Sequence, residues 1–240
     1  MYKIEIEKDT NGNLVIKDAC FTNAGDLTTY LQSLEQDSEC TVKVNVDSEE
    51  LSNINTAISD DTSKNTKKVK VNLDLSECTE ITEIAESNFE SNEYLVGIVI
   101  PEGVETIGNS AFSGCSRLTS VTIPESVTTI GVCAFSKCNC LTSVILPTDI
   151  TSIEGKAFYG CSGLTSITIP SKVTTIGLYA FDGCSGLTEI TVNSDNEKYD
   201  SRDECNAIIE TSAKTLLSGC KNTNIPNTVT SIGDFAFSEC

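Results

Sequence analysis

A segment of 23 residues recurs along much of this chain, and that spacing is the strongest constraint on its fold. One copy, Leu164–Gly186, reads LTSITIPSKVTTIGLYAFDGCSG, and the segments one and two spacings upstream are closely similar. Three residue types keep the spacing in columns: Phe89, Phe112, Phe135, Phe158 and Phe181; Ile84, Ile107, Ile130, Ile153 and Ile176; Cys115, Cys138, Cys161 and Cys184. A constant period of about 20–30 residues is typical of stacked units that bury their apolar faces against one another.

Apolar and polar residues alternate in the first half of each copy. Ile167 and Ile169 are predicted to face the core while Ser166 and Thr168 face away, which is the two-residue period of a strand. Pro170 ends this strand because proline has no backbone N–H to donate.

The second half of each copy is predicted to return the chain to the core. In the same copy, Val173–Ile176 reads as a short extended or 3₁₀ segment, Gly177 marks a turn, and Ala180 and Phe181 point inward. Stacked coils place strand on strand at about 4.8 Å, so equivalent residues form columns and a parallel sheet.

These residues carry a resemblance to a known family. The motif LTSxTIPxxVTxIGxxAFxGCxx, legible at Leu118–Cys140 and Leu164–Gly186, closely resembles the BspA-like leucine-rich repeat, and the likeness covers residues 66–240. It implies a right-handed α/β leucine-rich-repeat solenoid of parallel stacked strands. Members are typically surface or secreted proteins of host-associated microbes, so the resemblance implies a cell-surface or extracellular location. It also implies a protein partner, such as a host extracellular protein.

Residues 1–66 depart from the repeat and are predicted to form an α/β N-terminal cap. Two strands flank a turn at Asn11–Asn13, and another strand follows at Cys40–Val46. One helix is expected to start with Asp26 as its N-cap and a second with Asp47 or Ser48. Their apolar faces are predicted to comprise Leu27, Tyr30, Leu31 and Leu34 in the first helix and Leu51, Ile54 and Ile58 in the second. A cap shields the open end of a stacked sheet, although an independent binding domain is the alternative.

The rest of the chain divides at breaks in the repeat. Repeats are predicted over 67–192 with a degenerate first copy, an inserted hairpin over 193–223, and a final partial repeat over 224–240. The hairpin is expected because NAIIE and TLLSG flank TSAK. The sequence stops partway through a repeat, which we interpret as a truncation or as a surface that self-associates with another copy.

The twelve cysteines are interpreted mainly as free thiols. The column Cys115, Cys138, Cys161 and Cys184 occupies one core position per coil, and buried cysteine behaves as a small hydrophobic residue. Some disulfides are the alternative, whereas parallel side chains do not converge as a zinc site requires. Centring the hairpin turn on TSAK places Cys205 opposite Cys220, either as a disulfide or as a reduced cross-strand pair.

Composition excludes several functions. The net charge of −19 repels nucleic acid and anionic membranes, and no apolar run approaches the length of a membrane-spanning helix. The N-terminus has no run of signal-peptide type, so either a leader has been removed or none existed. The chain has no histidine, which excludes hydrolases built on a Ser–His or Cys–His pair. We therefore expect no enzyme activity, no cofactor, no metal site and no nucleic-acid partner.

Outward-facing strand residues are the candidate binding surface. They form two columns: Ser120, Ser143, Ser166 and Glu189; Thr122, Ile145, Thr168 and Thr191. Solenoids use such extended surfaces for recognition, although threonine also favours exposed strand positions without any ligand. Tyr199 and Arg202 are predicted to extend this surface along the rim of the insertion.

The leading hypothesis is a non-catalytic protein-binding module for adhesion or recognition. One alternative is a structural spacer or stalk that presents another domain. A second is a calcium-dependent or glycan-binding adhesin, because Asp195, Glu197, Asp200, Asp203 and Glu204 supply oxygen ligands, although they lack the spacing of a dedicated calcium loop.

Overall fold

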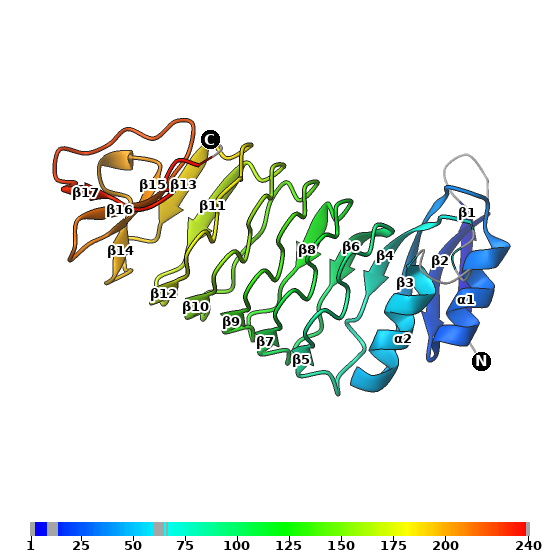
Figure 1. The fold of residues 1–240 in the computed structure, drawn as a ribbon. Helices are drawn as coiled ribbons and strands as arrows, with labels where there is room; N and C mark the ends of the chain where they lie inside the picture. Colours follow the sequence, from blue (N-terminus) through cyan, green and yellow to red (C-terminus); the bar gives the residue numbers. More distant parts are fainter. Residues whose placement is uncertain (1–2, 9–13, 60–64, 66, 239–240) are drawn as a thin grey trace.

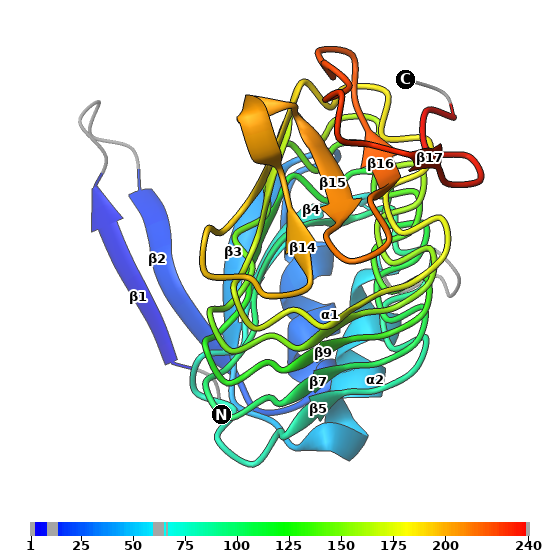
Figure 2. The same ribbon diagram turned by 90° about the vertical axis from the view of Figure 1, so that its left-hand side faces the viewer.

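The computed structural model describes residues 3–8, 14–59, 65 and 67–238 of the 240-residue chain. A sheet with two helices forms one end, a regular stack of coils forms the middle, and a small four-stranded sheet forms the other end (Figure 1). Figure 2, which looks along the molecule, shows the coils lying over one another. The stacked strands confirm the predicted solenoid of short parallel strands; its handedness stays a prediction.

The N-terminal elements form where the sequence indicates them. They are β1 (Lys3–Lys8), β2 (Leu14–Phe21), α1 (Ala24–Ser33), β3 (Glu39–Val44), α2 (Ser48–Ile58) and β4 (Lys70–Asp74). β1 and β2 are antiparallel, whereas β2, β3 and β4 run parallel. The predicted turn at Asn11–Asn13 lies outside the described residues.

The helix caps correct one expectation. The N-cap of α1 is Asn23, whose side chain accepts a hydrogen bond from the backbone N–H of Asp26 at 2.9 Å, so Asp26 lies in the first turn instead. Asn23 is the N-cap because the buried face of the helix already begins at Ala24, three residues before Leu27. For α2 the cap is Asp47, which accepts from the N–H of Glu50 at 2.9 Å.

The N-terminal sheet continues into the stack without a break. β4 pairs with β6 (Leu95–Val99), and β6 pairs with β8 (Ser120–Thr122), all parallel. The resulting six-stranded sheet has the order β1-β2-β3-β4-β6-β8. The helix-bearing unit therefore lies at one end of the strand face, and the boundary predicted at residue 66 falls within a continuous sheet.

A second parallel sheet runs along another side of the stack. Its two-residue strands are β5 (Glu83–Ile84), β7 (Thr106–Ile107), β9 (Thr129–Ile130), β10 (Ser152–Ile153) and β12 (Thr175–Ile176). Each isoleucine of the predicted column is paired with the isoleucine of the next coil. The repeat spacing is therefore also the register of this sheet.

The phenylalanine column forms the centre of the stack. Neighbouring rings from Phe89 to Phe181 lie 5.1–5.6 Å apart between centroids, and their planes are within 8° of parallel. The four rings before Phe181 are completely buried. Each ring contributes burial of its apolar area and contact with a ring above and below.

The cysteine column is a set of free, buried thiols, as the sequence predicts. Each Sγ donates a hydrogen bond, at 3.0–3.2 Å, to the carbonyl oxygen of a phenylalanine in the preceding coil. Burial raises the pKa of Cys115 to about 12 and also raises the pKa of Cys138 and Cys161. These thiols are therefore neutral packing groups.

The C-terminal region contains the predicted hairpin. Its elements are β11 (Ser166–Ile169), β13 (Glu189–Val192), β14 (Tyr199–Asp200), the 3₁₀ turn η1 (Arg202–Glu204), β15 (Ala207–Glu210), β16 (Thr215–Gly219) and β17 (Ser231–Ile232). β15 and β16 are antiparallel, whereas β17 runs parallel to β16. β11 and β13 form a separate two-stranded sheet.

The sequence left a disulfide and a reduced cross-strand pair open for Cys205 and Cys220, and the structure forms neither: both thiols are free and they do not lie opposite each other in the hairpin. The hairpin register shifts between Ile208 and Ile209, so the pairing at the turn does not extend to the cysteines. As a result, Cys205 packs into a small cluster with Leu216, whereas Cys220 packs into the main core.

Candidate functional site

The predicted outward columns occupy one strand face of the stack. Ser166 is paired with Glu189 and Thr168 with Thr191 in the β11–β13 ladder. The hydroxyl oxygens of Thr168 and Thr191 lie 2.9 Å apart. Ser120 and Thr122 lie on β8, at the end of the six-stranded sheet, and both are exposed. Most of the candidate residues are thus placed together by the repeat itself.

This face is interrupted over one coil, at 141–147. Within the described part of the chain, no strand is assigned here, and the one backbone hydrogen bond joining the segment's strand side to a neighbouring coil runs from the N–H of Thr165 to the carbonyl of Thr142. The six-stranded sheet therefore ends at β8, and the sheet that begins at β11 is separate. The edge of β8 toward this segment is left without ladder partners.

A cleft lies beside the interruption, between β8 and the segment around residue 145. Its volume is about 220 Å³. It is lined by Ser120, Val121, Thr122, Ile123, Ser143 and Ile145. Ile145 is 83% exposed, which makes it the most exposed large apolar side chain in the described part of the chain. Four of the residues predicted from sequence therefore line one hollow around an apolar centre.

Hydroxyl groups along the coils fall into two classes. Thr119, Thr165 and Thr188 each donate a hydrogen bond to a backbone carbonyl of the preceding coil. The hydroxyls of Ser120 and Ser143, by contrast, have no hydrogen-bond partner among the described residues. The first class stabilises the stack, whereas the second is free to bind a ligand.

Tyr199 is not part of the exposed surface, contrary to expectation, since only 3% of it is accessible. It lies 23 residues after Ile176, and its hydroxyl accepts a hydrogen bond from the N–H of Ile176 at 3.2 Å. Tyr199 lies on β14, which pairs with β15 and not with β12, so its side chain covers the end of the isoleucine column while its backbone belongs to the sheet of the insertion. The constant spacing is the signal that could have predicted its burial.

Arg202 is partly exposed and paired within the insertion. Its Nε donates to Asp200 Oδ1 at 2.7 Å, and Thr211 donates to the other carboxylate oxygen at 2.9 Å. Burial alone would raise the pKa of Asp200, but the hydrogen bonds from Arg202 and Thr211 outweigh it and lower that pKa. The described residues contain no group of three or more His, Cys, Asp or Glu side chains that could hold a metal ion.

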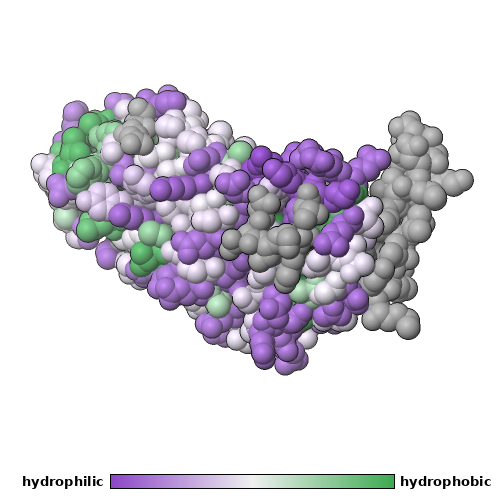
Figure 3. Space-filling model, turned by 45° about the vertical axis from the view of Figure 1, so that its right-hand side comes forward, coloured by the Kyte–Doolittle hydropathy of each residue, from purple (hydrophilic) through white to green (hydrophobic). Residues whose placement is uncertain are grey.

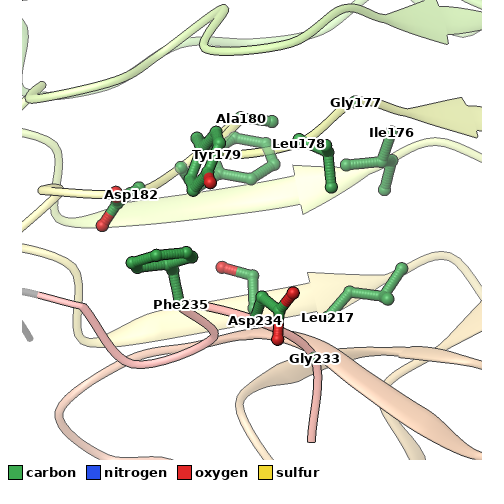
Figure 4. A pocket seen from close by; sticks show the side chains of 12 residues that line it. Ile176, Gly177, Leu178, Tyr179, Ala180, Asp182, Leu217, Gly233, Asp234 and Phe235 are labelled. Carbon is green, nitrogen blue, oxygen red and sulfur yellow. The ribbon is translucent and has the colours of Figure 1, made fainter.

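A second hollow, which sequence reasoning missed, lies between the turn that follows β12 and the coil that carries β17 (Figure 4). It has a volume of about 150 Å³ and is lined by Leu178, Tyr179, Phe235 and neighbouring residues. The rings of Tyr179 and Phe235 are 5.0 Å apart and inclined at 60°. In Figure 3, apolar residues gather toward the end of the molecule far from the N-terminal sheet. The exposed large apolar residues there are Leu178, Ile225, Ile232 and Phe235.

The sequence matches the BspA type leucine-rich repeat region in six copies, over residues 82–203 and 208–240. The chain belongs to this family. The predicted resemblance is therefore confirmed. Domains of this repeat type generally mediate protein interactions and are typically non-enzymatic.

Solved structures of bacterial repeat proteins share the fold. A leucine rich cell surface protein from Faecalibacterium prausnitzii is 25% identical with a TM-score of 0.56; the match covers all of this chain and 68% of that one. A leucine-rich repeat protein from Bacteroides ovatus is 33% identical with a TM-score of 0.50, covering 66% of this chain and 45% of that one. One from Eubacterium ventriosum, at 20% identity and a TM-score of 0.57, covers 98% and 55%.

Among curated proteins, none matches the sequence. In the part of the chain that the structure describes, no helix has the length and apolar character needed to cross a membrane.

Proposed function

We propose that this chain is a non-catalytic module of a cell-surface or secreted protein, and that it binds a partner protein through its outer strand face. The strand face is defined as Ser120, Thr122, Ser143, Ile145, Ser166, Thr168, Glu189 and Thr191. The observation that carries the proposal is the cleft at the interruption, where Ile145 stands exposed beside an unpaired strand edge.

The chemistry of this face suits a protein partner. An apolar centre surrounded by polar groups is the usual anatomy of an interface. Ile145 is the apolar centre here, and the unpartnered hydroxyls of Ser120 and Ser143 lie around it. An unpaired strand edge also offers backbone groups that a partner's backbone can match.

Location and partner class draw on the family. One similar structure is a cell surface protein, and the strongly acidic chain is poorly suited to nucleic acid. A host extracellular protein is the partner we expect. Since the chain has no histidine, and the strand face presents hydroxyls around an apolar side chain, binding without catalysis is the function that this surface supports.

The test compares substitutions on two sides of the stack, using biolayer interferometry against a panel of purified host extracellular proteins. Ile145→Glu, or Ser166→Arg with Thr168→Arg, should weaken binding at least tenfold, because each places charge on the strand face. Val132→Glu is the matched control, since Val132 is exposed and apolar but lies at the turn after β9. Binding unchanged by both strand-face variants would overturn the proposal.

Two other functions make different predictions. A structural spacer, which the continuous phenylalanine stack would suit, predicts no saturable binding to any protein of the panel. A calcium-dependent adhesin predicts a higher melting temperature on adding calcium, reversed by chelation. Arg202 and Thr211 already donate hydrogen bonds to the two carboxylate oxygens of Asp200, which argues against calcium binding by this carboxylate in the insertion loop.

A further inference from the structure

A ladder of backbone hydrogen bonds follows the turn that precedes each core phenylalanine. In the regular stack, N–H groups two residues apart donate to carbonyls of the next coil; each coil has two such donors at the turn and a third after them, such as Gly160, whose N–H donates to Asp182. The pairs, at 2.7–3.0 Å, are Ser110 and Phe112 to Val132 and Ala134, Cys133 and Phe135 to Gly155 and Ala157, and Lys156 and Phe158 to Leu178 and Ala180. The two accepting carbonyls in each coil are therefore also two residues apart.

This ladder stops at the coil before the insertion. The equivalent donors are the N–H groups of Tyr179 and Phe181, and neither has a hydrogen-bond partner among the described residues. Both residues line the second hollow, where the next coil would otherwise lie. The insertion has therefore opened a slot whose floor carries two aligned backbone donors.

The walls of the slot are apolar and acidic. Figure 4 shows the rings of Tyr179 and Phe235 facing one another, with Asp182 beyond one end of the pair. Leu178 is 75% exposed and Phe235 is 58% exposed. The Oδ1 atom of Asp182 is buried without a hydrogen-bond partner in the described part of the chain, and Asp234 adds a second carboxylate.

We propose that this slot binds an extended peptide segment of a partner protein, in which a basic side chain neighbours an apolar one. The two N–H donors require two carbonyl acceptors spaced two residues apart, which is what the next coil supplies elsewhere in the stack. An extended polypeptide backbone presents acceptors at that spacing. The volume of about 150 Å³ accommodates one apolar side chain beside the contacting rings of Tyr179 and Phe235.

Charge selects the rest of the peptide. A free anion would satisfy the two donors but would meet the carboxylates of Asp182 and Asp234, and the whole chain carries −19. A neutral carbonyl avoids that repulsion. A lysine or arginine beside it offsets the negative charge of Asp182 and Asp234.

This inference is independent of the proposed function, because the slot and the strand face share no residue. The experiment is selection of a phage-displayed library of linear ten-residue peptides on the full chain. Enriched peptides should carry a basic residue near an apolar one. Phe235→Glu and Leu178→Glu should each weaken their binding at least tenfold, whereas Ile145→Glu should leave it unchanged. Both slot residues are largely exposed, so these variants are expected to fold.

Two further measurements distinguish peptide binding in the slot from nonspecific binding. Asp182→Asn should weaken peptides that contain lysine by several-fold without affecting neutral variants of the same peptides. Bound peptide should also slow hydrogen exchange at the amides of Tyr179 and Phe181. Failure to enrich any peptide, or enriched peptides that bind Phe235→Glu as well as the parent, would overturn the inference. A concentration-dependent dimer that Phe235→Glu abolishes would assign the slot to a second copy and would overturn it too.

Discussion

The regular coils and the C-terminal region follow the same sequence motif, yet they differ in how completely each coil is covered. Phe135 lies between two parallel rings and is completely buried, whereas Phe237, which takes the same motif position in the last coil, is only partly buried. The N–H of Phe158 has a carbonyl partner in the next coil, but that of Phe181 has none among the described residues. Repetition therefore satisfies backbone and core groups only where the next coil lies in register.

The difference explains where binding can occur. In the regular stack, the turn side of each coil is covered by its neighbour, and the surface consists of outward side chains. Where one coil deviates, at 141–147, or where the hairpin is inserted, strand edges and apolar side chains become accessible. Both candidate sites lie at such departures from the repeat.

The largest expected effect comes from breaking the ring stack. Phe135→Ala should reduce the free energy of unfolding by about 3–5 kcal/mol, because it leaves a cavity between two buried rings. Phe235→Ala should reduce it by less than about 1 kcal/mol, since that ring is mostly exposed. Urea denaturation of both variants measures the contrast, and equal losses would contradict it.

Close approach of neighbouring coils gives the next contrast. A Cβ added at Gly177 would overlap the backbone nitrogen of Gly155, so Gly177→Ala should cost about 1–3 kcal/mol. At Gly233 the nearest atom to such a Cβ is the carbonyl oxygen of Leu216 at 3.2 Å. Gly233→Ala should therefore change the stability by less than about 0.5 kcal/mol in the same assay. A larger loss at Gly233 would show that the last coil packs as tightly as the others.

Alkaline pH tests the cysteine column. The folded pKa of Cys115 is about 12, above the unfolded value of about 8.5, so its contribution to stability is complete below about pH 8.5 and declines as pH rises toward 12. Each such thiol should lower the free energy of unfolding by about 1.4 kcal/mol per pH unit in that range. Cys138→Ala removes one such thiol, so the free energy of unfolding of this variant should fall less steeply with pH than that of the parent. A slope unchanged by this variant would contradict the burial of the column.

The smallest effects should come from ion pairs, and here the C-terminal region should exceed the stack. Lys172 and Asp149 lie 2.7 Å apart, but their side chains are 58% and 57% exposed, so Lys172→Ala should cost less than about 0.5 kcal/mol. Arg202→Ala should cost about 1–2 kcal/mol, because Asp200 would lose partly buried hydrogen bonds.

Acid pH checks the same pair. The folded pKa of Asp200 is lowered, so the contribution of Arg202 is present above the unfolded pKa of about 3.9 and disappears as pH falls through the lower folded value. A difference between Arg202→Ala and the parent that persists at pH 2 would mean that Arg202 acts through packing instead.

Much of the fold could be predicted because each repeated residue meets the same neighbours in every coil. The spacing of Phe89 to Phe181 was enough to predict the ring column, and TSAK was enough to predict the turn of the hairpin. The cap at Asn23 was missed because Asn23 and Asp26 are both good caps, and only the start of the apolar face chooses between them.

The candidate sites were harder to predict because each depends on one local departure from the regular repeat. The register shift between Ile208 and Ile209, which separates Cys205 from Cys220, leaves no distinct mark in the sequence. The strand interruption near Ile145 arises in a coil whose motif is otherwise normal. The slot beside Tyr179 requires knowing where the chain returns after the insertion, and residue spacing does not encode that position.

Amide hydrogen exchange is the most direct test of the claim that coils in register satisfy one another and that the ladder ends at the insertion. In the free protein at neutral pH, the amides of Phe112, Phe135 and Phe158 should be strongly protected, whereas those of Tyr179 and Phe181 should exchange at least about a hundredfold faster. Equal protection at Phe158 and Phe181 would contradict the account, because it would mean that the next coil continues the ladder.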